Sequence, residues 1–366
     1  MASLLSFTLP KHSLLIKASA SSSPTTTTTT TTTIPQSPSQ LLEDKFGRKG
    51  IKFTDSGSVE LTVRNGSSLS LRLSDAFVTS YKPKVYWKDD GFEEVLYTIP
   101  SSTDSLTPSK GGIGLVLTDV TNSDSTNGSP SFISDWTVND VDSDSIDALQ
   151  VELRCTNGAL EIKYIISLFT LSMATAVIVK NKSPKVVKLS SAILTHFKFK
   201  SRSGSAIQGL KGCSYCAHPP LSSNFEIMSP ADAMKPEPPS WTSFLFNGKE
   251  SPEKKVGLSW TVEDNVFTMM RGKLSRVYTA PPAERSKRIY RTPPSKYETI
   301  DQGSGLGFRV IRMGYDDIYL ASPGSFSKKY GNDYFICTGP ASMLVPVVLN
   351  PGEEWKGAQV IEHDNL

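Results

Sequence analysis

The chain has 366 residues, of which 38% are hydrophobic and 9% aromatic, so it can bury a large core in one or two domains. Its formal net charge is +3, with Lys and Arg mixed among Asp and Glu, which argues against the concentrated basic face of a nucleic-acid-binding protein. Four cysteines in a chain of this length do not form a disulfide framework and favour a reducing compartment.

The first 42 residues contain no Asp or Glu and are dominated by Ser and Thr. Such a composition buries too little apolar surface to offset its ordering entropy, so it predicts disorder. An acid-poor, hydroxyl-rich start without Arg is more typical of a plastid transit peptide than of a mitochondrial or secretory signal, and a plain disordered tail is the alternative. We assign residues 1–45 to a chloroplast transit peptide and disordered linker, and residues 46–366 to one folded domain.

Strand patterns dominate the first half of the folded chain. Apolar and polar residues alternate on both sides of Asn65-Gly66 from residue 59 to 73, which predicts a hairpin. The uncharged run 164–179 is shorter than the roughly 20 residues of a spanning helix and is rich in β-branched residues, which favours a buried hairpin. Further strands are expected at 77–81, 95–99, 111–117, 136–138, 148–154, 160–171, 174–179 and 186–199.

The second half combines strands with two irregular segments. Residues 219–252 are rich in Pro and aromatic residues, so they form either a docking loop or a cover over the sheets. Within this segment Trp241, Phe244 and Phe246 are candidate partner contacts. The basic segment 280–299 is a solvated loop or, like residues 101–108, another docking element. Strand patterns return at 260–278, 306–313 and 317–320.

Near the end, the apolar runs 334–337 and 344–349 flank a segment of small residues and predict a closing strand pair, followed by a turn at residues 350–352 and by Trp355 as an anchor. Regularly spaced strands without a long amphipathic helix predict an all-β protein, an antiparallel sandwich or barrel.

Six motifs between residues 59 and 360 resemble those of the aldose 1-epimerase (galactose mutarotase) family, closest to its hexose-6-phosphate branch. They are Asp75-Ala-Phe-Val-Thr-Ser-Tyr-Lys82, Lys110-Gly-Gly-Ile-Gly114, Ala192-Ile-Leu-Thr-His-Phe197, Gly209-Leu-Lys-Gly212, Ser275-Arg-Val-Tyr278 and Asn350-Pro-Gly-Glu-Glu-Trp355. The resemblance implies a large antiparallel β-sandwich of the galactose mutarotase type.

The resemblance also implies that the reaction has been lost. Mutarotation needs a general acid and a general base, for which the family uses a histidine and a glutamate. In this chain the histidine position is Leu194 and the glutamate position is Gly339, and neither side chain transfers protons. His196 is two residues from Leu194, on the same strand face, so replacement of the acid by His196 is one interpretation, although the base is still missing. The preferred interpretation of His196 is a polar group satisfied in the core.

Other family positions have changed as well. The second histidine and the arginine that grip the sugar become Gly128 and Phe132, and a further arginine becomes Lys110. The family's aspartate is retained as Asp317. We expect Lys110, His196 and Asp317 to form a vestigial sugar pocket, which leaves a non-catalytic carbohydrate-binding module as one alternative function.

The sequence predicts no cofactor or metal. Cys213-Ser-Tyr-Cys216 with His218 offers three candidate ligands where structural zinc takes four, so we expect a loop with two incidental thiols.

Residues 46–53 and 80–97 resemble a plant group of this fold, the NDH-dependent cyclic electron flow proteins. The group includes the second subunit of subcomplex B of the chloroplast NAD(P)H dehydrogenase-like (NDH) complex and a close assembly-related paralogue. The resemblance implies a non-catalytic subunit without a transmembrane helix, peripheral to the stromal side of the thylakoid membrane. Its implied partners are the other subunits and, indirectly, photosystem I. A plastid hexose-phosphate mutarotase-like enzyme is the other alternative.

Overall fold

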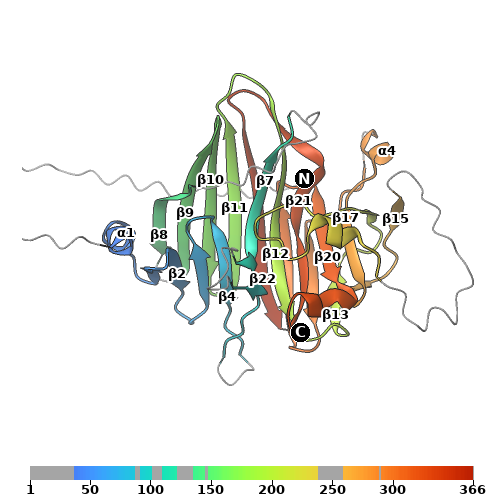
Figure 1. The fold of residues 1–366 in the computed structure, drawn as a ribbon, viewed down its shortest axis with the longest axis horizontal. Coiled ribbons are helices and arrows are strands. Elements are labelled where there is room, and N and C mark those ends of the chain that lie inside the picture. Colours follow the sequence, from blue (N-terminus) through green and yellow to red (C-terminus); the bar gives the residue numbers. More distant parts are fainter. Residues whose placement is uncertain are drawn as a thin grey trace, which may run out of the picture. The chain divides into compact units, whose positions relative to one another are not determined.

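Two large antiparallel sheets make up the fold of the described residues (Figure 1). The structure is a computed structural model that describes residues 37–86, 91–100, 109–121, 135–144, 147–237, 259–287 and 290–365, and the folded unit begins at Ser37. The predicted all-β antiparallel architecture is confirmed. Several predictions lie outside the described residues, namely those on the leader up to residue 36, on residues 101–108, and on Gly128, Phe132, Trp241, Phe244 and Phe246.

The first sheet has eleven strands. In spatial order they are β1 (Ile51–Phe53), β2 (Ser58–Thr62), β3 (Ser68–Arg72), β4 (Phe77–Lys82), β7 (Ile113–Asp119), β12 (Val187–Phe199), β21 (Tyr334–Leu349), β20 (Asp317–Pro323), β17 (Lys273–Tyr278), β14 (Ser214–Ala217) and β15 (Trp260–Val262). A separate two-stranded ladder joins β5 (Thr98–Ile99) and β6 (Lys110–Gly111).

The second sheet has nine strands. In spatial order they are β16 (Phe267–Met269), β13 (Ser205–Gln208), β18 (Lys296–Asp301), β19 (Leu306–Met313), β22 (Glu354–Asn365), β11 (Ser172–Asn181), β10 (Leu160–Phe169), β9 (Ala148–Asn157) and β8 (Thr137–Asp144). The helices of the described residues are α1 (Pro38–Phe46), α2 (Pro230–Met234), α4 (Pro282–Arg285) and the 3₁₀ helix η1 (Gly324–Lys329). None of these helices has the length and apolarity needed to cross a membrane.

The two sheets face each other across one large core. Side-chain hydrogen bonds join them, with 2.7 Å between the hydroxyl oxygens of Tyr297 and Thr338, and 2.7 Å from Gln359 Nε2 to Thr195 Oγ1. Along β11 every second side chain is buried in this core, as the period of two requires, and most of β10 follows the same pattern. The fold is therefore a β-sandwich, and each sheet also has an outer face.

Both predicted hairpins are confirmed. β2 and β3 pair on either side of Asn65-Gly66, where Gly66 has a φ of 88° that suits glycine. The uncharged run 164–179 lies in the antiparallel pair β10 and β11, in which Tyr164 opposes Val177.

The predicted closing strand pair is wrong. The apolar runs 334–337 and 344–349 belong to one continuous strand, β21, because the small residues between them are also paired or enclosed by β12 and β20. The turn at 350–352 then leads to β22 in the other sheet, where Trp355 donates a 3.0 Å hydrogen bond from Nε1 to the carbonyl of Gly314.

Local structure also forms in segments predicted to be irregular. Helix α1 lies almost entirely in the predicted disordered linker, because Ser37 caps it, Pro38 starts it, and Leu42 and Phe46 pack on the core. Cys216 lies in strand β14 (Ser214–Ala217), which pairs with β15 and β17, whereas Cys213 directly precedes the strand. The predicted loop with two thiols is therefore wrong for Cys216. The basic segment 280–299 contains α4 and the start of β18.

Candidate functional site

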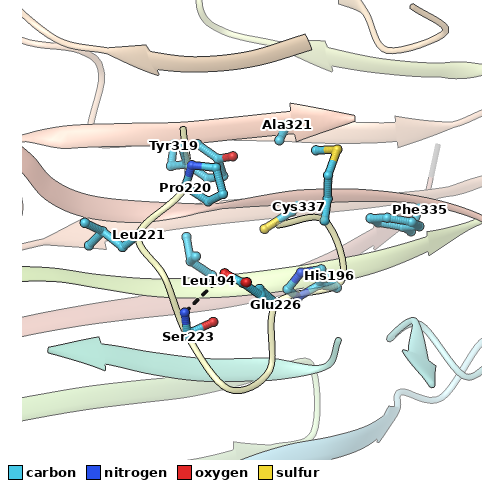
Figure 2. Close-up of a pocket in the computed structure, with 11 residues that line it drawn as sticks. Leu194, His196, Pro220, Leu221, Ser223, Glu226, Tyr319, Ala321, Phe335 and Cys337 are labelled. Atoms are coloured by element: carbon cyan, nitrogen blue, oxygen red, sulfur yellow. Dashed lines mark hydrogen bonds between the residues drawn. The ribbon is translucent and has the colours of Figure 1, made fainter. Parts of the chain in front are cut away.

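The candidate site lies on the outer face of the eleven-stranded sheet. Leu194 and His196 on β12 point to this face, as their even spacing predicted, and Tyr319 on β20 and Cys337 on β21 point to it as well. Figure 2 shows these side chains projecting from the strands toward a loop that crosses above them. Leu194, the position that the family resemblance assigns to the catalytic histidine, therefore lies on the same sheet face as His196, Tyr319 and Cys337.

That face is covered by residues 219–234 of the same chain, which we call the cover. Phe225 and Met228 from the cover form a buried apolar cluster with Leu194. The backbone N–H of Gly111 donates a 2.8 Å hydrogen bond to the carbonyl of Phe225, which fixes the loop to β6, the short strand before β7. Of the two predictions for residues 219–252, the structure therefore supports the cover for the part of the segment that it describes.

Gly114 makes room for the cover. A Cβ atom added to Gly114 would lie 2.4 Å from Cε1 of the Phe225 ring, so only glycine lets the ring rest on β7. The ring also lies 5.8 Å from the Phe77 ring and 6.4 Å from His196, measured between centroids. The Phe225 ring of the cover therefore lies against β7, close to Phe77 and His196.

Little free space remains beneath the cover. The cavity lined by Leu194, His196, Glu226, Tyr319 and Cys337, among others, has a volume of about 10 Å³. A space of that size holds about one water molecule. A hexose does not fit unless the cover moves.

His196 is a buried, neutral imidazole. Its side chain is 3% exposed, and Nδ1 lies 3.3 Å from the carbonyl oxygen of Gly112. Burial lowers the pKa of His196 to about 4, and the Gly112 carbonyl only partly opposes the shift. At neutral pH this ring carries no positive charge, so it is not a protonated acid that could replace the histidine missing at Leu194. Its burial and the Gly112 carbonyl fit the preferred interpretation, a polar group satisfied in the core.

Glu226 is a carboxylate in the cavity that the sequence did not reveal. It comes from the cover, and its Oε2 accepts a 3.2 Å hydrogen bond from the backbone N–H of Ser223 (Figure 2). Burial raises the pKa of Glu226, while that N–H and the charge of Lys110 lower it. An acidic residue within the apolar run 225–228 of a polar loop was the only signal in the sequence.

Of the three predicted sugar-pocket residues, only His196 lines this cavity. Asp317 is fully buried at the start of β20, where it forms a 3.0 Å ion pair with Arg285 and accepts a 3.0 Å hydrogen bond from the backbone N–H of Met343. Lys110 begins β6 at a partly exposed position. The carboxylate of Asp317 therefore already binds Arg285 and the backbone of β21.

Gly339, at the position assigned to the catalytic glutamate, has no room for a side chain. It opposes Tyr319 in the β20–β21 ladder, and an added Cβ would lie 1.9 Å from the carbonyl oxygen of Ile193. A glutamate there would require the backbone of β12 to move.

We expect Gly339→Ala to lower the free energy of unfolding by about 1–3 kcal/mol, because it overpacks two central strands. Urea denaturation measures this effect. Gly272→Ala is the control, since its Cβ would meet only Glu237 Oε2 at 3.8 Å, and it should be close to neutral. Equal effects of the two substitutions would contradict the crowding at Gly339.

The burial of His196 predicts a pH dependence of stability. Its pKa is about 4 in the folded chain and about 6.5 when unfolded, so below pH 6.5 the unfolded chain binds a proton that the folded chain excludes. Stability should fall by about 3 kcal/mol between pH 7 and pH 4 for this reason. In His196→Phe this contribution to the pH dependence of the free energy of unfolding should disappear, as measured by urea denaturation at a series of pH values. The same pH dependence in the variant and the wild type would argue against a neutral His196.

The thiols of Cys213 and Cys216 form no disulfide and are protonated. Cys213 and Cys216 are both free and buried, and burial raises the pKa of Cys216 to about 11. The described part of the chain contains no cluster of three or more side chains suited to a metal ion.

Comparisons with known proteins find the two groups that the sequence motifs resemble, the NDH-dependent cyclic electron flow proteins and the galactose mutarotase-like proteins. No protein-family profile matches the chain. It is 26% identical to NDH-dependent cyclic electron flow 5 of Arabidopsis thaliana over 333 residues, which cover 89% of this chain and 82% of the relative. It is 31% identical to a glucose-6-phosphate 1-epimerase-like protein of Cenchrus ciliaris over 77 residues, or 19% and 23% of the two chains.

Solved structures share the fold at low sequence identity. A mutarotase-type protein of Salmonella typhimurium matches with a TM-score of 0.59 and 12% identity over 86% of this chain and 93% of its own. A galactose mutarotase-like protein of Clostridium acetobutylicum matches with a TM-score of 0.52 and 12% identity over 84% and 95%. The chain therefore has a galactose mutarotase-like β-sandwich, and both resemblances predicted from its motifs are confirmed.

Proposed function

We propose that this chain is a non-catalytic structural subunit of the chloroplast NDH complex, which supports cyclic electron flow around photosystem I. The observation that carries the proposal is the cover. Residues 219–234 cover Leu194, the position that the resemblance assigns to the family's histidine, and about one water's volume remains beneath them. Gly339, the position assigned to the glutamate, has no room for a side chain. The likeness to NDH-dependent cyclic electron flow 5 over most of both chains supports the process.

The proposed location is the stromal side of the thylakoid membrane, with the chain held there by the other subunits. The plastid-type composition of the leader supports the chloroplast, and the likeness to NDH-dependent cyclic electron flow 5 supports an association with the NDH complex. Within the complex the chain would be the second subunit of subcomplex B or its assembly-related paralogue.

Fractionation of thylakoids tests the proposal. After mild solubilisation and native electrophoresis, mass spectrometry should find the chain co-migrating with the NDH complex. An alkaline wash without detergent should release it, because the attachment is to protein rather than to lipid. A chain found only as a free stromal protein would refute the assignment.

The enzymatic alternative has a direct test. Purified protein should not accelerate the interconversion of glucose or glucose 6-phosphate anomers above the buffer rate, because His196 is uncharged at neutral pH and lines a cavity of only about 10 Å³ beneath the cover. Any acceleration that scales with protein concentration and disappears in His196→Phe would establish an enzyme instead.

A further inference from the structure

Strand β1 is one edge of the eleven-stranded sheet. It pairs with β2 on one side, and no other strand of the described residues pairs with it on the other side. An edge strand presents a row of backbone N–H and C=O groups, which form a template for pairing with another chain. What this protein places against β1 therefore matters for its solubility and for its assembly.

Two backbone N–H groups of β1 face the open edge. The residues that flank β1 bond to β2: the carbonyl of Gly50 accepts a 2.7 Å hydrogen bond and the N–H of Thr54 donates a 2.9 Å one. Successive residues of an antiparallel strand point their backbone groups in alternate directions. The N–H groups of Ile51 and Phe53 therefore point away from β2.

The preceding segment of the chain occupies both of these N–H groups. The N–H of Ile51 donates a 2.9 Å hydrogen bond to the carbonyl of Arg48, in the turn that follows α1. The N–H of Phe53 donates a 2.9 Å hydrogen bond to Oε2 of Glu43, a residue of α1. The Glu43 carboxylate thus takes the place that a carbonyl of a neighbouring strand would have.

Helix α1 is held in this position along its whole length. The hydroxyl of Ser37, which caps the helix, lies 3.3 Å from Oδ1 of Asp55, just beyond β1, and the Ser39 hydroxyl binds the same carboxylate. Leu42 and Phe46 pack on the core. In Figure 1, α1 lies near β2 at this end of the sheet, and it contacts β1. The contacts that place the cap on β1 therefore begin with Ser37.

Composition alone would end the leader within this helix. The stretch without Asp or Glu runs to residue 42, and Glu43 is the first acidic residue, in the middle of α1. A cut at that boundary would remove Ser37 and Leu42, which hold the helix. A cut a few residues later would also remove Glu43 and leave the N–H of Phe53 on an open edge. A stable mature protein therefore requires an earlier cut.

We propose that a processing peptidase removes the leader by a cut before Ser37, so that the mature protein keeps α1 as a cap over β1. The step is the hydrolysis of one peptide bond by water. It leaves a new amino group on the mature chain and a carboxylate on the released leader. The removal of a leader rests on the proposed function, whereas the capping of β1 rests only on the contacts of α1.

Import of the full-length chain into isolated chloroplasts tests the position of the cut. Mass spectrometry of the N-terminal peptide of the imported protein should find a shortened chain whose first residue is Ser37 or an earlier one. A first residue beyond Ser37, or an imported chain of unchanged length, would overturn the inference and leave the chloroplast location standing. A chain that is not imported would refute both.

Hydrogen exchange of the purified full-length protein tests the cap itself. In Glu43→Ala the amide of Phe53 should exchange about tenfold faster, because it loses a hydrogen bond to a charged group. Glu43→Gln keeps an amide oxygen as acceptor and should restore most of the protection. Glu60→Ala removes an exposed carboxylate from the neighbouring strand β2, so it is the matched control and should leave the exchange of Phe53 unchanged. Equal exchange in Glu43→Ala and the wild type would overturn the role of α1 as a cap.

Discussion

Replacing Arg285 by methionine is expected to lower the free energy of unfolding by about 3–5 kcal/mol, because it leaves a buried carboxylate without its cation. Asp317 has no exposed surface, and Nη2 of Arg285 lies 3.0 Å from its Oδ1. The same carboxylate accepts hydrogen bonds from the backbone N–H groups of Met343 and Leu344, so it joins β20, β21 and the segment around α4. Urea denaturation of the purified chain measures the loss.

Arg309→Met is the matched control for this experiment. Arg309 pairs with Glu298 and Glu362 at the surface, where ion pairs contribute at most about 1 kcal/mol. Similar small losses in both variants would show that Asp317 tolerates burial without Arg285. Its predicted role as a sugar-binding residue would then regain interest, since the carboxylate would not be needed to hold the fold.

Phe225→Ala is expected to detach the cover and to cost about 3–5 kcal/mol, the usual range for removing a buried phenylalanine. Phe225 is 5% exposed and lies between Gly114 and the cluster that contains Leu194. The most direct measurement is thiol labelling of Cys337, which the cover buries at 6% exposure. Its reaction with a disulfide reagent should be much faster in the variant.

Phe267→Ala provides the comparison, because Phe267 is 47% exposed on the edge strand β16. It should change neither stability nor the labelling of Cys337 appreciably. If Cys337 remains protected in Phe225→Ala, the ring is not what holds the cover, and Met228 and the ion pairs around α2 become the better candidates.

The sequence predicted those parts of the fold that depend on local alternation. The hairpin at Asn65-Gly66 and the pair β10 and β11 follow from apolar residues at every second position, which any single strand reveals. The continuity of β21 could not be predicted in this way. Its middle contains Gly339 and Pro340, which normally end a strand, and only pairing with β12 and β20 carries the strand through.

The candidate site was predicted in part for a similar reason. The shared face of Leu194 and His196 follows from a spacing of two, so it could be read from the chain. The cover and Glu226 come from an irregular, Pro-rich segment without periodicity, and their position depends on contacts with Gly111 and Gly114 far away in sequence. The occupation of Asp317 by Arg285 likewise depends on tertiary structure alone.

The cover also changes how the protein responds to its surroundings. A protein with an open binding pocket is stabilised by its ligand through mass action, so its stability follows the ligand's concentration. Here the occupant of the face is covalently part of the chain and is present at all times. The stability contributed by this face would therefore not depend on the concentration of a free ligand. Residues 219–234 would stabilise the fold to the same extent whatever the concentrations of small molecules around it.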